Sequence, residues 1–284
     1  MAIQEELLER VLKSPRLPSI PAVALKIIDL VQQDEVNMDA IAETIKQDPA
    51  LSTKVLKTVN SSFYGQAKTI STINQALVVL GLNSVKTLAL GFSLVGNLSD
   101  AGVEGFDHVT LWRRSLFSAT AAKHLCDLNA IVQAEEVFMA SLLQDVGMLA
   151  LSQTIGSQYA HLLKEAGDDH RALAGLEQAA LSGDHAEVGG ALAEQWGLPP
   201  VLALPIRYHE SAEDAPENVM PLARAVVAGG SVADLMMDPD SEAKTARCYE
   251  RLLHWYNMEA EQAKTFLAEV HQQAGEVQRL FDLP

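Results

Sequence analysis

Apolar residues recur at three- and four-residue spacing along almost the whole chain, and this periodicity limits the fold more than any other feature. The pattern runs from Leu7 to Leu12, resumes at Val23, and continues in segments to Leu280. Residues three or four apart share one face of a helix, so each segment predicts an amphipathic helix. No run of four or more residues alternates as a strand would, and no fixed-period repeat is present. The sequence therefore predicts an all-α fold of many short helices.

Capping residues, glycine and proline mark where these helices begin and end. Asp48 stands before a proline, which predicts an N-cap followed by proline at the first helical position. Gly81 interrupts the apolar pattern of residues 73–98 and predicts a break there. Asp184, with Glu187 three positions later, forms a capping-box pattern at the start of another helix.

Acidic residues outnumber basic ones by 37 to 21, which gives the 284-residue chain a formal charge of −16. Phosphate binding needs clustered lysine and arginine, so this charge argues against nucleic acid and against an anionic membrane surface as partners. The longest apolar stretch, residues 88–98, contains glycine and asparagine and is too short for a membrane span. The acidic start lacks the basic region of a signal peptide. We therefore expect a cytoplasmic protein with no nucleic-acid or membrane partner.

The chain has two cysteines, Cys126 and Cys248, which are too few for a disulfide framework or a thiolate zinc site. Both lie among apolar residues with helical spacing, so we expect free, buried thiols. Hydrophobic residues make up 48% of the chain, which is enough to bury them in a core.

Asp145 is the titratable residue with the most apolar sequence around it. It lies within a segment that we expect to form one helix from Glu135 to Leu151. Burying a carboxylate costs several kcal/mol unless a partner offsets the loss of water. Asp145 therefore faces solvent, pairs with an arginine, binds a metal, or serves as a buried electrostatic anchor.

Two histidines lie near predicted helix ends. His185 is in the first turn of a predicted helix over Ala186–Trp196, where the positive end of the helix dipole lowers the pKa of a histidine and favours its neutral, metal-binding form. His209 precedes Glu210 at the end of the next predicted helix, where a histidine more commonly caps the helix than binds a metal.

Ordered motifs run from about residue 15 to residue 212. They are Leu17-Pro18-Ser19-Ile20-Pro21, Gln47-Asp48-Pro49-Ala50-Leu51, Val59-Asn60-Ser61-Ser62-Phe63-Tyr64-Gly65, Thr69-Ile70-Ser71-Thr72-Ile73-Asn74-Gln75-Ala76, Leu80-Gly81-Leu82-Asn83, His185-Ala186-Glu187-Val188-Gly189 and Trp196-Gly197-Leu198-Pro199. Together these motifs resemble the HDOD family (HD-related output domain). The resemblance implies a regulatory relative of HD-type metal-dependent phosphohydrolases, of the kind found in bacterial signalling proteins.

The resemblance also implies an HD-like multi-helix bundle with an N-terminal helical subdomain. We expect an N-terminal helix at 1–14, the N-terminal HDOD subdomain at 15–100, an HD-like core at 106–215, and C-terminal helices completing the bundle at 216–284. The boundary falls within residues 97–106, the interval with the weakest pattern in the first half, which contains Gly102 and Gly105.

HD hydrolases hold metal with a first histidine, a His-Asp pair and a later aspartate, in some members with additional histidines. Matching that pattern to this chain places Arg114 at the first histidine and Gln144-Asp145 at the His-Asp pair. The resemblance therefore implies that two nitrogen ligands are replaced and that the aspartate of the His-Asp pair, Asp145, is kept.

The additional histidine positions are better preserved. His185 keeps one of them, and His209-Glu210 stands where related cyclic-dinucleotide enzymes have a His-His pair. Near the final aspartate the nearest carboxylate is Asp234, and its register with the family pattern is left open.

Arg114 cannot ligate a metal, and its charge beside the site repels a divalent ion. A glutamine amide is a poor substitute for imidazole. We therefore predict that Arg114 pairs with Asp145, fills the electrostatic role of the metal, and leaves the chain without a cofactor. The alternative is a three-ligand site of Asp145, His185 and His209 for iron, manganese or zinc.

The leading hypothesis is a non-catalytic signalling module whose degenerate pocket binds a small ligand or nothing. Its surface would engage a signalling protein in trans: a sensor kinase, a response regulator or a cyclic-dinucleotide enzyme. The second hypothesis is a metal-dependent phosphohydrolase or phosphodiesterase in which Arg114 clamps the substrate phosphate. A third is a sensor that binds a nucleotide through Arg114 and Gln144 without hydrolysing it.

Overall fold

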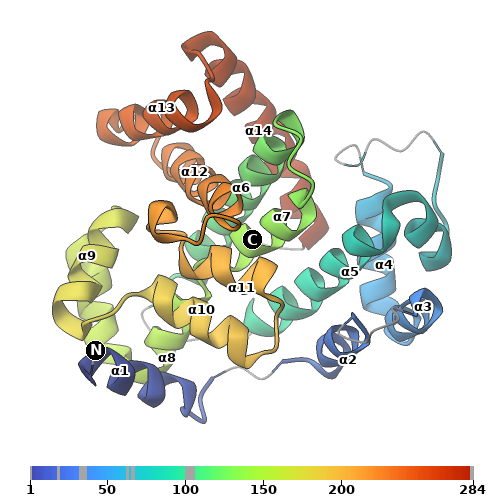
Figure 1. Ribbon diagram of the computed structural model, residues 1–284, viewed down its shortest axis with the longest axis horizontal. Helices are drawn as coiled ribbons and strands as arrows, with labels where there is room; N and C mark the ends of the chain where they lie inside the picture. The colour runs from blue at the N-terminus through green and yellow to red at the C-terminus, as the bar shows by residue number, and fades with distance from the viewer. Residues whose placement is uncertain are drawn as a thin grey trace. The chain divides into compact units, whose positions relative to one another are not determined.

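The computed structural model describes residues 2–17, 20–31, 37–61, 64, 68–99 and 106–281, and every regular element among them is helical (Figure 1). This confirms the all-α prediction. The chain divides into two compact units, one of Met1–Leu17 with Gly102–His271 and one of Pro18–Ala101 with Gln272–Pro284. The motif residues Pro18, Ser19, Ser62, Phe63 and Gly65, and residues 100–105 of the expected boundary, lie outside the described residues.

The unit beginning at Pro18 is built from four consecutive helices. They are α2 (Ala22–Val31), α3 (Met38–Lys46), α4 (Pro49–Val59) and α5 (Ile73–Ser99). The Asp48 side chain accepts the backbone N–H of Leu51 at 2.9 Å, so the predicted cap of α4 is confirmed. The predicted break at Gly81 is also confirmed, because this residue has φ 82° and kinks α5, a conformation that glycine adopts without strain.

The unit containing Gly102–His271 holds the remaining helices. They are α1 (Ala2–Leu12), α6 (His108–Leu128), α7 (Ala134–Leu143), α8 (Val146–Ala166), α9 (His170–Leu181), α10 (His185–Gln195), α11 (Pro200–Arg207), the short 3₁₀ helix η1 (Ala212–Asp214), α12 (Met220–Met237), α13 (Glu242–Tyr256) and the part of α14 (Ala260–Phe281) up to His271. Helix α6 packs on α7 and α12 at the centre, and α1 packs on α8, α9 and α10 (Figure 1). One apolar core cluster joins Leu125, Val232, Leu252 and Phe266.

Both cysteines are buried in this unit, Cys126 on α6 and Cys248 on α13. Burial raises the pKa of each thiol to about 12, so both stay protonated and unreactive at neutral pH. The prediction of free buried thiols is confirmed.

The expected single helix from Glu135 to Leu151 is wrong. Helix α7 ends at Leu143 and α8 begins at Val146, so Asp145 lies at a junction between two helices instead of in mid-helix. Almost every residue of α7 and of the first turns of α8 is buried, so the apolar pattern has no polar face that could show where one helix stops.

Two segments are long and apolar enough to cross a membrane by length and composition alone, residues 73–96 and helix α12. Core helices of folded domains pass the same test, and 67% of the α12 window and 50% of the other are buried inside the protein. Helix α12 packs on α6, α7, α11 and α13, which is the packing of a core helix.

We predict that Gly147→Ala destabilises the protein and pulls α8 away from α10. A β-carbon at Gly147 would lie 1.9 Å from the backbone oxygen of His185 and 2.8 Å from the backbone nitrogen of Gly189. Overpacking of this kind costs about 1–3 kcal/mol or more. The control is Gly175→Ala, because Gly175 lies in α9 with open space around it and alanine favours the helix by about 0.5–1 kcal/mol. Thermal unfolding of both variants tests this, and equal midpoints would contradict the close approach.

Candidate metal centre

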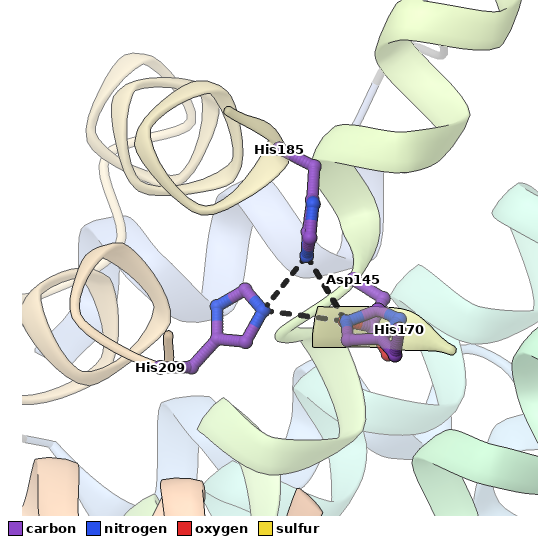
Figure 2. A group of neighbouring side chains, drawn as sticks. All are labelled: Asp145, His170, His185 and His209. Atoms are coloured by element: carbon purple, nitrogen blue, oxygen red, sulfur yellow. Dashed lines mark hydrogen bonds and ion pairs between the residues drawn. The ribbon is translucent and has the colours of Figure 1, made fainter. Parts of the chain in front are cut away.

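Four side chains converge where several helices begin or end (Figure 2). Asp145 lies at the α7–α8 junction, His170 and His185 are the first residues of α9 and α10, and His209 follows the end of α11. One donor atom from each residue lies within 4.8 Å of all the others. Helix termini thus bring together residues that are far apart in the sequence.

The spacing of these donor atoms fits a single bound ion. The Nε2 atom of His185 lies 3.1 Å from the Nε2 atoms of both His170 and His209. Oδ1 of Asp145 lies 3.2 Å from His170 Nε2, 3.3 Å from His209 Nε2 and 3.8 Å from His185 Nε2. Ligands bound tetrahedrally at about 2.0–2.1 Å would lie about 3.3 Å from one another. Oδ1 is also buried without a hydrogen bond of regular geometry among the described residues, so its lone pairs are available to a ligand.

The other oxygen of the same carboxylate is bound by Arg114. Nη1 of Arg114 lies 2.5 Å from Oδ2 of Asp145, and Nε lies 2.9 Å from Oδ1 of Asp234 on α12. The predicted Arg114–Asp145 pair is therefore present. Asp234, the carboxylate nearest to the expected final aspartate, therefore reaches the site through Arg114.

Mutual attraction holds this buried pair in its charged form. Burial alone would favour the neutral forms, but Asp145 and Asp234 raise the pKa of Arg114 above its usual value. Burial likewise opposes ionisation of Asp145, and Arg114 together with His170 outweighs it and lowers the pKa of that carboxyl well below its usual range.

Gln144 lies on the arginine side of Asp145. Its side-chain nitrogen is 3.3 Å from Oδ2 of Asp145, and its oxygen accepts the Ser118 hydroxyl at 2.9 Å. The amide therefore supports the carboxylate oxygen that Arg114 binds, and it adds no donor to the histidine group.

His185 is oriented by Glu177, a buried residue of α9 that the sequence analysis did not identify. One oxygen of Glu177 accepts both the backbone N–H of His185 at 3.0 Å and its Nδ1–H at 2.6 Å, while Tyr159 donates to the other oxygen at 2.5 Å. The predicted lowering of the His185 pKa is wrong: burial lowers it, but the Glu177 carboxylate outweighs burial and the pKa rises. With Nδ1 donating, Nε2 is left to face the group, as in carboxylate–histidine–metal arrangements.

His209 does cap the last turn of α11, as its position predicted, but its side chain is buried. It is 4% exposed, and its Nδ1 lies 2.7 Å from the backbone oxygen of Ile206. A carbonyl oxygen only accepts, so Nδ1 carries a hydrogen, and Nε2 is the ring nitrogen that faces the other donors.

His170 is the ligand candidate that sequence reasoning missed. The expected helix began one residue later, at Arg171, and the family pattern offered no position for a histidine there. Oε1 of Glu210 lies 3.3 Å from its Nε2 and 3.7 Å from that of His209, so Glu210 faces the same group. Burial and Arg114 lower the pKa of His170, but Asp145 and Glu210 outweigh them and raise it to about 10.

The centre has an excess of negative charge that calls for a cation. Asp145, Glu177, Glu210 and Asp234 bring four carboxylates, whereas Arg114 is the one arginine or lysine within hydrogen-bond distance of any of them in the part of the chain that the structure describes. Uncompensated buried charge is costly, so protons on the histidines or a divalent ion must supply the balance. Three imidazoles and a carboxylate suit zinc, iron or manganese.

A cavity of 640 Å³ opens beside the centre. Its lining includes Arg114, Asp145, His170 and Asp234. Small-molecule sites commonly measure about 300–1,000 Å³, so this cavity has room for a ligand of nucleotide size.

The fold is an HD-like helical domain, and its site joins three histidines and Asp145 to the Arg114 guanidinium. The family model described as HDOD domain matches residues 17–212, and the chain belongs to the HDOD family.

Three solved structures share the fold. A protein of Shewanella amazonensis SB2B, provisionally named a phosphohydrolase, is 25% identical with TM-score 0.76, and the alignment covers 97% of each chain. An HDOD domain protein of unknown function from Geobacter sulfurreducens is 24% identical with TM-score 0.69 and 98% coverage of each chain. A Marinobacter aquaeolei VT8 protein, provisionally named a signal transduction protein, is 20% identical with TM-score 0.67, covering 99% of this chain and 66% of that one.

One curated relative, an uncharacterised protein of Treponema pallidum (strain Nichols), is 25% identical over 269 residues. The match covers 93% of this chain and 50% of the relative, so the chain spans about half the length of the curated protein it matches.

We predict that Arg114→Ala lowers the free energy of unfolding by about 3–5 kcal/mol, because it leaves the Asp145 and Asp234 carboxylates without their cation. Arg114→Lys should recover part of the loss, since lysine restores the charge without the two-pronged geometry. The matched control is Arg207→Ala, which removes a more exposed pair with Glu194 and should cost at most about 1 kcal/mol. Urea denaturation measures the free energy of unfolding of both variants. Equal decreases for Arg114→Ala and Arg207→Ala would contradict the prediction.

Proposed function

We propose that this chain is a non-catalytic signal-transduction module with a degenerate HD site: Arg114 fills one metal position, and a single divalent ion occupies the other. The supporting observation is that the two carboxylate oxygens of Asp145 have different partners. Oδ2 pairs with Arg114, whereas Oδ1 lies among three imidazole nitrogens. The two readings of the sequence, an arginine pair and a metal site, use different oxygens of one carboxylate. They are therefore compatible.

The ligand set favours a structural or sensing ion. Structural zinc sites have four protein ligands, whereas catalytic sites keep a position open for water or substrate. Here Asp145, His170, His185 and His209 supply four donors, and Glu210 lies close enough to serve as a fifth. The neighbouring position, where an HD hydrolase would place a metal, holds a permanent cation that cannot polarise a bound water.

A module of this kind acts through what it binds. We propose that it works in trans on a signalling protein in the cytoplasm, such as a sensor kinase, a response regulator or a cyclic-dinucleotide enzyme, and that a nucleotide is its candidate small ligand. The net charge of −16 supports a protein partner over nucleic acid or an anionic membrane.

The second candidate is a metal-dependent phosphohydrolase or phosphodiesterase. The 640 Å³ cavity favours it, because its lining includes Asp145 and His170 and gives a substrate access to the donor group. In that case Glu210 or one histidine would leave the ion, and Arg114 would bind the substrate phosphate.

We predict about one zinc, iron or manganese ion per chain in protein purified without chelator, because the four donors are spaced for one ion. Elemental analysis normalised to protein concentration measures this. His170→Ala should lose most of the metal, whereas His161→Ala, an exposed histidine of α8, should retain it. A metal content near zero in the wild-type protein would overturn the bound ion, with the centre then balanced by protonated histidines.

Metal-loaded protein should hydrolyse an activated phosphodiester, such as bis-p-nitrophenyl phosphate, no faster than chelator-treated protein, because the ligand set leaves no open position. A rate that depends on added metal and disappears in His170→Ala would favour the phosphodiesterase over the non-catalytic module.

A further inference from the structure

Three arginines gather beside the metal centre without belonging to it. Arg171 comes from the first turns of α9, and Arg247 and Arg251 come from α13. They line a narrow pocket together with Arg114 and Ser231. In a chain with a net charge of −16, such a concentration of positive charge is unusual.

The outer arginines are incompletely paired. The nearest carboxylate oxygens to Arg247 belong to Asp234 at 3.9 Å and Asp169 at 4.0 Å, beyond hydrogen-bond distance. Arg251 donates to the Ser231 hydroxyl and, at 3.4 Å, to the backbone oxygen of Val227.

Neither Arg251 nor Arg171 has a carboxylate within 4.0 Å among the residues that the structure describes. Arg247 and Arg251 are also one helical turn apart, so like charges share one face of α13 and repel each other. Burial lowers the pKa of Arg251, and Arg247 and Arg171 lower it further, against partial compensation by Glu210 and Asp234. These arginines therefore present guanidinium groups to the pocket with no carboxylate oxygen closer than 3.9 Å among the described residues.

The two carboxylates that face this pocket are already engaged on their other side. Asp234 accepts Nε of Arg114 at 2.9 Å, and Glu210 lies 3.3 Å from Nε2 of His170. Their shorter contacts therefore go to Arg114 and His170, and not to Arg171, Arg247 or Arg251.

We propose that Arg171, Arg247 and Arg251 form a binding site for a phosphate or phosphoryl group next to the metal centre. The guanidinium fork matches phosphate oxygens and binds them with charge-assisted hydrogen bonds. The pocket shares Arg114, His170 and Asp234 with the 640 Å³ cavity, which gives the rest of a phosphorylated ligand a place to lie. The site goes beyond the proposed function, because none of its three arginines is a metal ligand and it does not require the ion.

Inorganic phosphate is the probe. It is titrated by calorimetry into two samples of the 284-residue chain, one treated with chelator and one loaded with metal. Chloride keeps the ionic strength constant. We expect saturable binding with one site per chain in both forms. Arg247→Gln should weaken it about tenfold or more, the effect of losing one hydrogen bond to a charged group. Arg251→Lys keeps the charge without the fork and should weaken it less.

Arg207→Gln is the matched control, because it makes the same change in charge at the pair with Glu194 and should leave the phosphate affinity within about twofold. The proposal is overturned if the wild-type chain shows no saturable binding, if Arg207→Gln loses as much as Arg247→Gln, or if binding occurs only in metal-loaded protein. If protein purified without chelator contains no metal and still binds phosphate, the arginine site is supported and the bound ion is refuted.

Discussion

The carboxylate of Asp145 is the interaction on which the rest of this site depends. It is 1% exposed, so both of its oxygens must find partners inside the protein. One oxygen binds Arg114, which also reaches Asp234 on α12, and the other faces three imidazoles carried by α9, α10 and the end of α11. A single side chain thereby links Arg114 to the three histidines, and losing it would take the shared carboxylate away from the Arg114 cation and from the histidine group.

The helices around Asp145 are arranged to make this sharing possible. The helical conformation is interrupted between α7 and α8, at Asp145 itself. Gly147 lets the backbone of α10 approach closely enough to bring His185 into the donor group. Glu177 then orients the His185 ring, and the backbone oxygen of Ile206 orients His209. These contacts outside the donor group decide which ring nitrogens face inward, and with them whether an ion can be held.

Local patterns in the sequence predicted the all-helical architecture, the Asp48 cap and the break at Gly81, because each depends on a few neighbouring residues. The Arg114–Asp145 pair was also predictable, since the motif resemblance placed both residues at metal positions. The place of His170 in the donor group, the role of Glu177 and the pKa of His185 were not predictable in the same way. All three depend on the packing of α9 against α8 and on the contact of Glu177, on α9, with His185, on α10. The helix-dipole argument for the pKa of His185 considered only the helix that carries this residue. The uniformly apolar segment around Asp145 likewise gave no indication of the junction between α7 and α8.

A crystal structure of protein purified without chelator, with anomalous diffraction recorded on both sides of the absorption edge of the bound metal, tests the central claim most directly. The account predicts one anomalous peak per chain, bounded by Oδ1 of Asp145 and the Nε2 atoms of His170, His185 and His209, with Arg114 still paired to Oδ2. A peak between Asp145 and Asp234 with Arg114 displaced, or a second peak on that side, would contradict it and restore the metal arrangement of an HD hydrolase.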